Sequence, residues 1–168
     1  MSETLPFPAT WHPLPGDSRL APLLDATDAA AIATMLVALE PWRTLGYRGE
    51  VLTRYLVRCD PALHRFRIVG GETVIGILCV RYPWLRGPYI ELVGVAPPAR
   101  GGGIGSAILA WIEAQVRGQA GNLWACVSES NAAARHFYAG HGFREVVPID
   151  DLVTHGHAEI LLRKRLTD

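Results

Sequence analysis

The sequence of 168 residues has few cysteines, no net charge and no long apolar run. Its three cysteines, Cys59, Cys79 and Cys126, are widely spaced among apolar neighbours, so we expect buried thiols of a reducing compartment and no disulfide framework. They form no Cys-x-x-Cys pair, so we expect no metal site. Sixteen Lys and Arg residues balance sixteen Asp and Glu residues, which leaves no basic footprint for nucleic acid. Nucleic acid is therefore not an expected partner.

The first 18 residues, "MSETLPFPATWHPLPGDS", contain four prolines and lack the basic start and apolar core of a signal peptide. No apolar run in the sequence approaches the ~20 residues of a membrane-spanning helix. These two absences predict a cytoplasmic protein that does not associate with a membrane. We expect residues 1–18 to form an extended lead-in and residues 19–168 to form a single domain.

Beyond the lead-in, the spacing of apolar residues alternates between the periods of helices and strands. The first helix has Asp25, Thr27 or Asp28 as its N-cap and is ended by Pro41. Gly70 and Gly71 join two strands in a hairpin. The expected strands are 20–24, 64–69, 73–82, 89–95, 122–128, 143–147 and 157–166, and the later helices are 50–57, 104–118 and 131–140. This order indicates one α/β domain.

A glycine-rich loop, "RGGGIG" at residues 100–105, links an expected strand to an expected helix. The first amides of a helix have no hydrogen-bonding partners within the helix, and together with the helix dipole they bind phosphate. Because glycine has no side chain, it lets a phosphate reach these amides. A tight structural turn also favours glycine. A dinucleotide fingerprint is the other alternative, with Gly101, Gly103 and Ser106 at its three positions. The loop alone leaves all three interpretations open.

About thirty residues later, "NAAARHFYAGHGF" has Asn131 as a helix N-cap and Tyr138 two turns along the same face. Core packing is the ordinary fate of such aromatic residues. The two segments together resemble the acyl-CoA motifs of the GCN5-related N-acetyltransferase superfamily. The patterns are Arg/Gln-x-x-Gly-x-Gly, matched at Arg100, Gly103 and Gly105, and Asn-x-x-Ala-x-x-Phe-Tyr-x-x-x-Gly-Phe, which begins at Asn131.

The resemblance implies an α/β (α+β) fold with a mixed, mostly antiparallel sheet that splays between its fourth strand (89–95) and its fifth (122–128), flanked by about four helices. It also implies acetyl-CoA as co-substrate, with the pantetheine arm along the fourth strand and the pyrophosphate on the loop amides. Gly101 and Gly102 are expected to be more replaceable than Gly103 and Gly105. The implied cofactor-binding residues are Val93, Val95, Arg100, Gly101, Gly102, Gly103, Ile104, Gly105, Asn131 and Tyr138.

For catalysis, the resemblance implies that Tyr138 gives a proton or a hydrogen bond to the departing thiolate. Glu91 is the expected base, because it is an acidic residue within an apolar strand. The alternative is that Glu91 faces solvent or pairs with an arginine. Glu159 and His136 are weaker candidates for the base.

The acceptor is expected to be a small-molecule or peptide amine, and the resemblance adds the expectation of a homodimer. Trp42, Tyr47, Trp84 and Asp151 are the candidate acceptor-binding residues, since they fall in segments that vary within the superfamily. Packing of the two tryptophans between helix and sheet is the alternative for them. A catalytically silent acyl-CoA-binding module and an NAD-dependent dehydrogenase remain as alternative functions.

Overall fold

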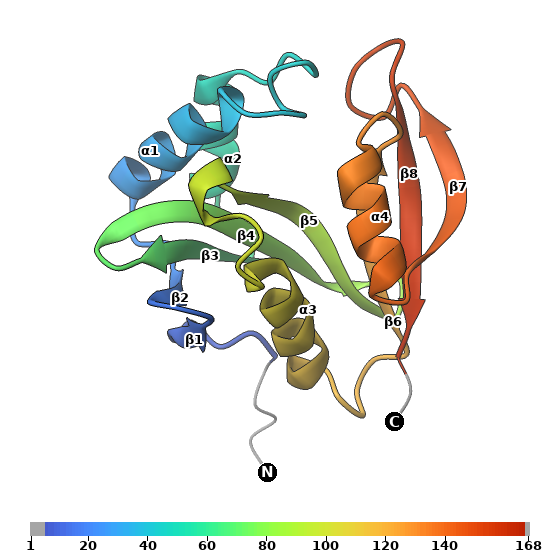
Figure 1. Cartoon of the computed structure of the whole chain (residues 1–168), viewed down its shortest axis with the longest axis horizontal. Helices are drawn as coiled ribbons and strands as arrows, with labels where there is room; N and C mark the ends of the chain where they lie inside the picture. Colours follow the sequence, from blue (N-terminus) through green and yellow to red (C-terminus); the bar gives the residue numbers. More distant parts are fainter. Residues whose placement is uncertain (1–5, 167–168) are drawn as a thin grey trace.

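The computed structural model describes residues 6–166, which form one eight-stranded sheet and four α-helices (Figure 1). The strands are β1 (His12–Leu14), β2 (Ser18–Pro22), β3 (Leu63–Gly70), β4 (Thr73–Trp84), β5 (Gly87–Val95), β6 (Asn122–Ser128), β7 (Arg144–Asp150) and β8 (Ala158–Arg165). The helices are α1 (Ala26–Val37), α2 (Gly49–Val57), α3 (Ile104–Gln115) and α4 (Ala132–Gly140), with a short 3-10 turn at Pro97–Ala99.

The strand order in the sheet is β1-β2-β3-β4-β5-β6-β8-β7, and every neighbouring pair is antiparallel except β5 and β6. The parallel pair is joined at only two positions, Tyr89 with Trp124 and Ile90 with Ala125. Beyond Ile90 the two strands part, and Figure 1 shows the gap that opens between them. The predicted fold class and the splay after the expected fourth strand are therefore confirmed.

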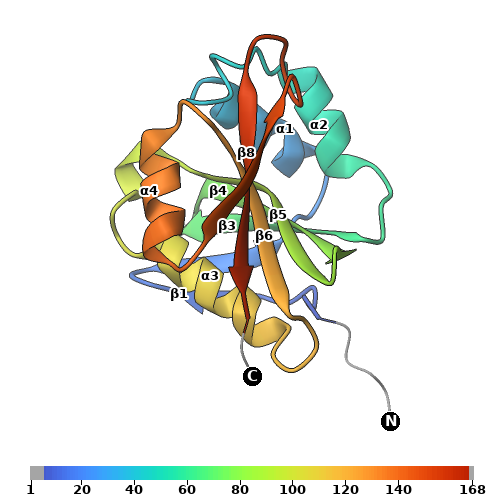
Figure 2. The same cartoon turned by 90° about the vertical axis from the view of Figure 1, so that its right-hand side faces the viewer.

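The helices form two layers, with α1 and α2 on one face of the sheet and α3 and α4 on the other (Figure 2). The α3 face has a core that includes Phe66, Ile108, Ile112 and Leu123. The α1 face has a separate core built around Ile32, Leu36, Leu52 and Leu56, together with the sheet residues Ile77, Cys79 and Leu92. Because alternate residues of a strand point to opposite faces, each central strand contributes to both cores.

Local sequence signals explain where the helices begin. Among the three candidate N-caps of α1, it is Asp25 whose Oδ1 accepts hydrogen bonds from the backbone of Thr27 (2.8 Å) and Asp28 (3.0 Å). Asn131 caps α4 in the same way, with its Oδ1 3.1 Å from the amide nitrogen of Ala134. Such caps satisfy amides that the helix itself leaves without partners.

The structure departs from the sequence-based expectations mainly near the N-terminus. Strand β1 lies inside the predicted lead-in and pairs with β2, and β2 itself begins earlier than expected. Residues 1–5 of that lead-in lie outside the described residues. Cys59 is exposed, contrary to the expectation of three buried thiols, because it follows the end of α2 in a connecting segment, whereas Cys79 is buried in β4. None of the helices within residues 6–166 is long and apolar enough to cross a membrane.

Candidate active site

The glycine loop turns sharply into α3. Gly101 and Gly103 have φ angles of +80° and +82°, and Gly103 is the N-cap of the helix in a left-handed conformation. An L-residue with a side chain adopts these angles only at a cost, so glycine is required there by the backbone. Gly102 has no positive φ, and a Cβ on it would meet only the carbonyl oxygen of Ala99, at 3.9 Å. The expectation that Gly101 is replaceable is thus not supported by its backbone angle.

Gly105 has a different role, which is the close packing of α3 against α4. A Cβ at Gly105 would lie 3.0 Å from Cζ of Phe137, so a larger residue would require the Phe137 ring to move. Ser106 Oγ and His141 Nε2 are 2.8 Å apart, and His141 Nδ1 is 2.8 Å from the carbonyl oxygen of Phe137. The two predicted acyl-CoA segments are therefore held against each other. Ser106 and His141 were not predicted to take part, since no pattern in the sequence connects them.

Tyr138 lies at this junction, in the second turn of α4. It is buried, and its ring makes edge-to-face contacts with Phe137 and Phe143, at centroid distances of 5.3 and 5.0 Å. Burial raises the pKa of the Tyr138 phenol above its usual value, so the group keeps its proton. No hydrogen bond of its hydroxyl is found within residues 6–166. The phenol is thus free to donate to a ligand.

The edge of β5 that faces β6 has no strand partner from Glu91 to Val95. Val93 and Val95 pack their side chains towards the core on the α3 face. Backbone groups on an unpaired edge are available to an extended ligand, in the way that they would bind another strand. The exposed side chain of Arg100 donates from Nε to the carbonyl oxygen of Val95, at 2.8 Å, and so lies back against the end of β5.

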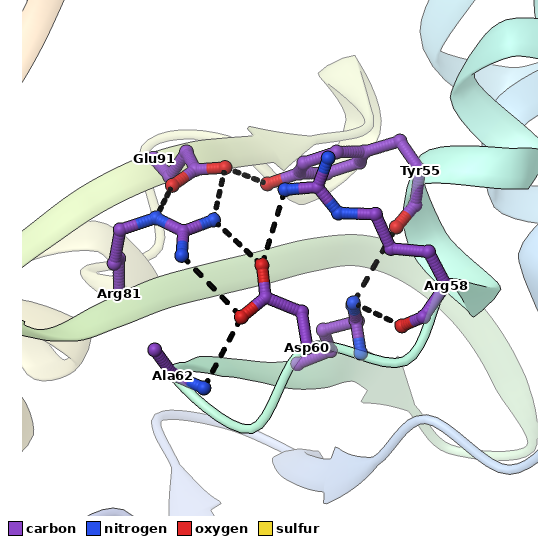
Figure 3. A network of polar contacts seen from close by, with 7 residues as sticks. Tyr55, Arg58, Asp60, Ala62, Arg81 and Glu91 are labelled. Carbon is purple, nitrogen blue, oxygen red and sulfur yellow. Dashed lines mark hydrogen bonds and ion pairs between the residues drawn. The ribbon is translucent and has the colours of Figure 1, made fainter.

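A β-bulge directs Glu91 to the α2 side of the sheet. Cys79 pairs with Leu92 and Val80 pairs with Ile90, which leaves Glu91 as the extra residue of β5. Its carboxylate accepts two hydrogen bonds from the Arg81 guanidinium, one to each oxygen, and one from the Tyr55 hydroxyl at 2.9 Å (Figure 3).

Arg81 also donates to both oxygens of Asp60, so its guanidinium lies between two carboxylates (Figure 3). Both neighbours favour the charged form of Arg81, and the hydrogen bond to Glu91 contributes most to raising the pKa of that guanidinium. The arginine pairing that the sequence left open for Glu91 is therefore present. Its role as a base stays a prediction.

Of the four candidate acceptor-binding residues, the two tryptophans make extensive packing contacts. Trp42 is buried in the core on the α1 face, where a Cβ on Gly94 would come within 2.7 Å of its ring. Trp84 stacks on Tyr89 with ring centroids 4.6 Å apart and meets Trp124 edge-on at 5.5 Å. Trp42 is thus part of the core, whereas Trp84 is half-buried and belongs to an aromatic group near the start of the splay.

The other two candidates lie in loops that meet over the sheet. Tyr47 is half-buried in the segment between α1 and α2, and burial raises its pKa, with the charge of Glu159 adding to the effect. Asp151 is exposed at the turn after β7 and accepts a hydrogen bond from the amide of Gly156 at 2.6 Å, which holds the loop itself. The two loops are joined where the Thr154 hydroxyl donates to the carbonyl of Leu45, at 2.7 Å.

Glu159 in β8 is the buried carboxylate of this region, with only 6% of its surface exposed. Ser128 Oγ donates to its Oε1 at 2.7 Å. Burial raises the pKa of Glu159 above 4.5, although the hydrogen bond from Ser128 and the nearby His157 oppose the rise. Exposed His136, the other weak candidate for the base, lies on α4, the helix that packs on the same face of the sheet as α3 (Figure 2). Within the described residues, no cluster suited to a metal ion is found.

Comparison with known proteins places this geometry in context. The model of the acetyltransferase (GNAT) family matches residues 30–143, which include both predicted acyl-CoA segments. A search of curated protein sequences found no match. Many solved structures are similar.

One similar structure is a nourseothricin acetyltransferase, with 29% identity over 64% of this chain and 68% of the other and a TM-score of 0.58. Another is Mycobacterium smegmatis RimJ in complex with CoA-disulfide, with 25% identity over 95% and 88% and a TM-score of 0.70. The fold is also that of Arabidopsis thaliana Naa50 in complex with the bisubstrate analogue CoA-Ac-MVNAL, with 20% identity over 89% and 99% and a TM-score of 0.67.

Proposed function

The chain belongs to the acetyltransferase (GNAT) family, and on that premise we propose that it transfers an acetyl group from acetyl-CoA to a primary amine. The observation that carries the proposal is the junction of α3 and α4, where Gly105 packs on Phe137 beside a buried Tyr138. This junction brings the N-terminus of α3, whose first amides are suited to an anion, and a protonated phenol to the same side of a splayed sheet.

In the proposed complex, the pyrophosphate of acetyl-CoA binds the free amides at the start of α3. The pantetheine arm runs along the unpaired edge of β5 near Val93 and Val95. The thioester then lies at the splay, on the side of Tyr138. The CoA ligands of similar structures, such as RimJ, support acetyl-CoA as the co-substrate.

The amine attacks the thioester carbonyl carbon, a carbon–nitrogen bond forms, and the carbon–sulfur bond then breaks. Tyr138 donates a proton or a hydrogen bond to the departing sulfur. Because its pKa is raised by burial, the phenol stays protonated over the pH range in which the amine becomes a nucleophile. Backbone amides of β5 stabilise the oxyanion of the intermediate.

A small-molecule or peptide amine is the proposed acceptor. Small-molecule and peptide acceptors are both represented among similar structures, as nourseothricin in one name and the MVNAL segment of a bisubstrate analogue in another. We further propose that the enzyme is cytoplasmic and uses no metal. The homodimer also stays a proposal, testable by light scattering.

The test is to incubate the purified chain with acetyl-CoA and a panel of amines while free thiol is followed. The panel contains nourseothricin, spermidine, and peptides that begin with Met-Val or Ala. Amine-dependent release of thiol is expected for at least one member. Tight binding of acetyl-CoA without thiol release from any amine would favour the silent module, and thermal stabilisation by NAD in place of CoA would contradict the proposal.

A further inference from the structure

We propose that the carboxylate of Glu159 binds the ammonium group of the acceptor and takes up its proton. The inference rests on the proposed function and deepens it, because it assigns the acceptor a primary aliphatic ammonium as the recognised group. It also assigns the proton-accepting role to β8, away from the arginine-paired Glu91 of β5.

The register of the sheet places Glu159 on the face opposite Tyr138. Glu159 pairs with Ser128 across β6 and β8, and directly paired residues share a face. Their neighbours Val127 and Ile160 belong to the core on the α3 face, which also contains Tyr138. The acid expected to protonate sulfur and the carboxylate of Glu159 therefore lie on opposite faces of the splayed sheet, so the acceptor amine and the departing sulfur are served by different groups.

Glu159 also lies beyond the point at which the sheet opens. Strands β5 and β6 pair last at Ile90 and Ala125, whereas Ser128, the partner of Glu159, is three residues further along β6. Above this part of the sheet, the hydrogen bond from Thr154 to Leu45 joins the loop before β8 to the loop before α2. The carboxylate thus lies buried at the splayed end of the sheet, near the joined loops.

Among the described residues, no lysine or arginine pairs with the Glu159 carboxylate. Oε1 accepts from Ser128, but among residues 6–166 Oε2 has no hydrogen-bonding partner, and it is not fully enclosed. A buried carboxylate without a cation costs free energy, and an ammonium ligand would remove that cost. The accessible oxygen is therefore suited to an N–H donor from a ligand.

Glu91 is less suited to this role, because both of its oxygens are already bonded to Arg81. The Glu91 carboxylate is therefore already fully occupied by a cation of this chain. Burial favours the uptake of a proton by Glu159. The two carboxylates thus divide their roles, with Glu91 holding Arg81 and Glu159 facing the acceptor.

The proton balance is simple. The acceptor ammonium gives one proton to Glu159 and becomes a neutral amine, which forms the new bond to the acetyl carbon. The second proton of the nitrogen leaves with the thiol, either directly or through Tyr138, and Glu159 returns its proton to solvent. No oxidant, reductant or metal is needed for this sequence.

The first test uses binding and needs no turnover. The full chain, labelled with 13C at glutamate carboxyl carbons and saturated with CoA, is titrated with ethylammonium chloride while NMR spectra are recorded. Comparison with Glu159→Gln assigns the Glu159 signal. We expect that signal to move saturably with ethylammonium but not with equal concentrations of ethanol or sodium chloride. An unmoved signal, or an equal shift with ethanol, would overturn the proposal, whereas failure to bind CoA would overturn the proposed function.

The second test measures kcat/KM with ethylamine and with 2,2,2-trifluoroethylamine, which are similar in size but cationic and neutral, respectively, at pH 7. Glu159→Gln should lose at least ~100-fold with ethylamine, the usual scale of a general base, and much less with the fluorinated amine. Glu72→Gln, an exposed carboxylate in the turn between β3 and β4, is the matched control and should retain full activity. Equal losses with both amines would contradict recognition of the ammonium.

The pH dependence of kcat/KM provides a readout that a merely structural role would not change. The titratable groups around Glu159 are Tyr47, Tyr89, Cys126 and His157, with Glu91 across the splay. Wild-type activity should rise as Glu159 ionises, above the ordinary pKa of 4.5. In Glu159→Gln this acidic limb should vanish, and its persistence would assign the limb to another group of this set.

Discussion

Replacement of Gly103 by alanine tests whether the proposed acyl-CoA loop depends on a left-handed backbone. Its φ of +82° costs an alanine about 1–2 kcal/mol. The cost is conformational, because the nearest atom to an added Cβ is Pro15 Cγ at 3.8 Å, an ordinary contact. Gly102→Ala is the matched control, since Gly102 has no positive φ and its Cβ would meet nothing closer than 3.9 Å.

The cost can appear in one of two ways. If the loop keeps its geometry in Gly103→Ala, the melting temperature should fall by about 2–8 °C, at ~2–4 °C per kcal/mol for a domain of this size. If the loop instead relaxes to a negative φ, the first amides of α3 are misdirected and the Kd for acetyl-CoA should rise about 5–30-fold, since 1.4 kcal/mol is a factor of ten. Gly102→Ala should change the Kd for acetyl-CoA by less than about twofold and the melting temperature by less than about 1 °C.

Calorimetry with acetyl-CoA and thermal denaturation measure the two quantities. A stronger version compares Gly103→Val with Gly102→Lys by the KM for acetyl-CoA. Equal effects at the two positions would refute the backbone argument, because only one of them has a left-handed φ. Gly101→Ala should resemble Gly103→Ala, since its φ is +80°.

Further predictions concern the proposed catalytic side chains and the packing beneath them. Tyr138→Phe should lower kcat by ~10²-fold or more at an unchanged KM for acetyl-CoA, with little loss of stability, as kinetics and thermal denaturation will show. Glu91→Gln should lower the melting temperature, because it weakens the pair with Arg81, yet it should leave the acidic limb of the kcat/KM profile in place. Gly94→Ala should cost about 1–3 kcal/mol in denaturant unfolding, since its Cβ would lie 2.5 Å from Cδ2 of Leu36. Glu159→Gln should be as stable as wild type or more so at pH 7, and lose this advantage below pH 4.5, as measured by unfolding across pH.

The expected pH dependence of the stability of Glu159→Gln follows from the raised pKa of the Glu159 carboxyl group. Between the unfolded value, about 4.5, and the higher folded value, the native state binds more protons than the unfolded state. The contribution of this group to stability is therefore fully present below pH 4.5 and is lost as the pH rises through the folded pKa. A Glu159→Gln variant that is less stable than wild type at pH 7 would show that the charged carboxylate has a stabilising partner.

Each of these variants has a clear contrary result. Unchanged kcat in Tyr138→Phe would remove the phenol from the chemical step. Loss of the acidic limb in Glu91→Gln would restore that residue as the base and count against Glu159. A Gly94→Ala protein of wild-type stability would mean that the α1 layer shifts freely over β5.

Sequence alone determined the features that depend on neighbouring residues. The cap Asn131, the apolar stripe of α3 and the glycine loop follow from local spacing, and the structure has each of them. For α1 the sequence offered three candidate caps, and the structure selects Asp25. The two acyl-CoA segments also identified the fold, because both patterns occur in the right order. Such signals are short-range, since a helix cap or a positive φ is satisfied within a few residues.

Tertiary structure decided what depends on contacts between distant segments. The bulge that turns Glu91 towards Arg81 and Tyr55 depends on the register of β4 against β5, which no local pattern specifies. The burial of Glu159 depends on the pairing of β8 with β6 and on loops more than a hundred residues apart. The sequence around Glu159 would look the same whether its carboxylate faced water or a site enclosed by loops. Its surroundings, and therefore its proton affinity, are fixed only when the sheet and the loops above it come together.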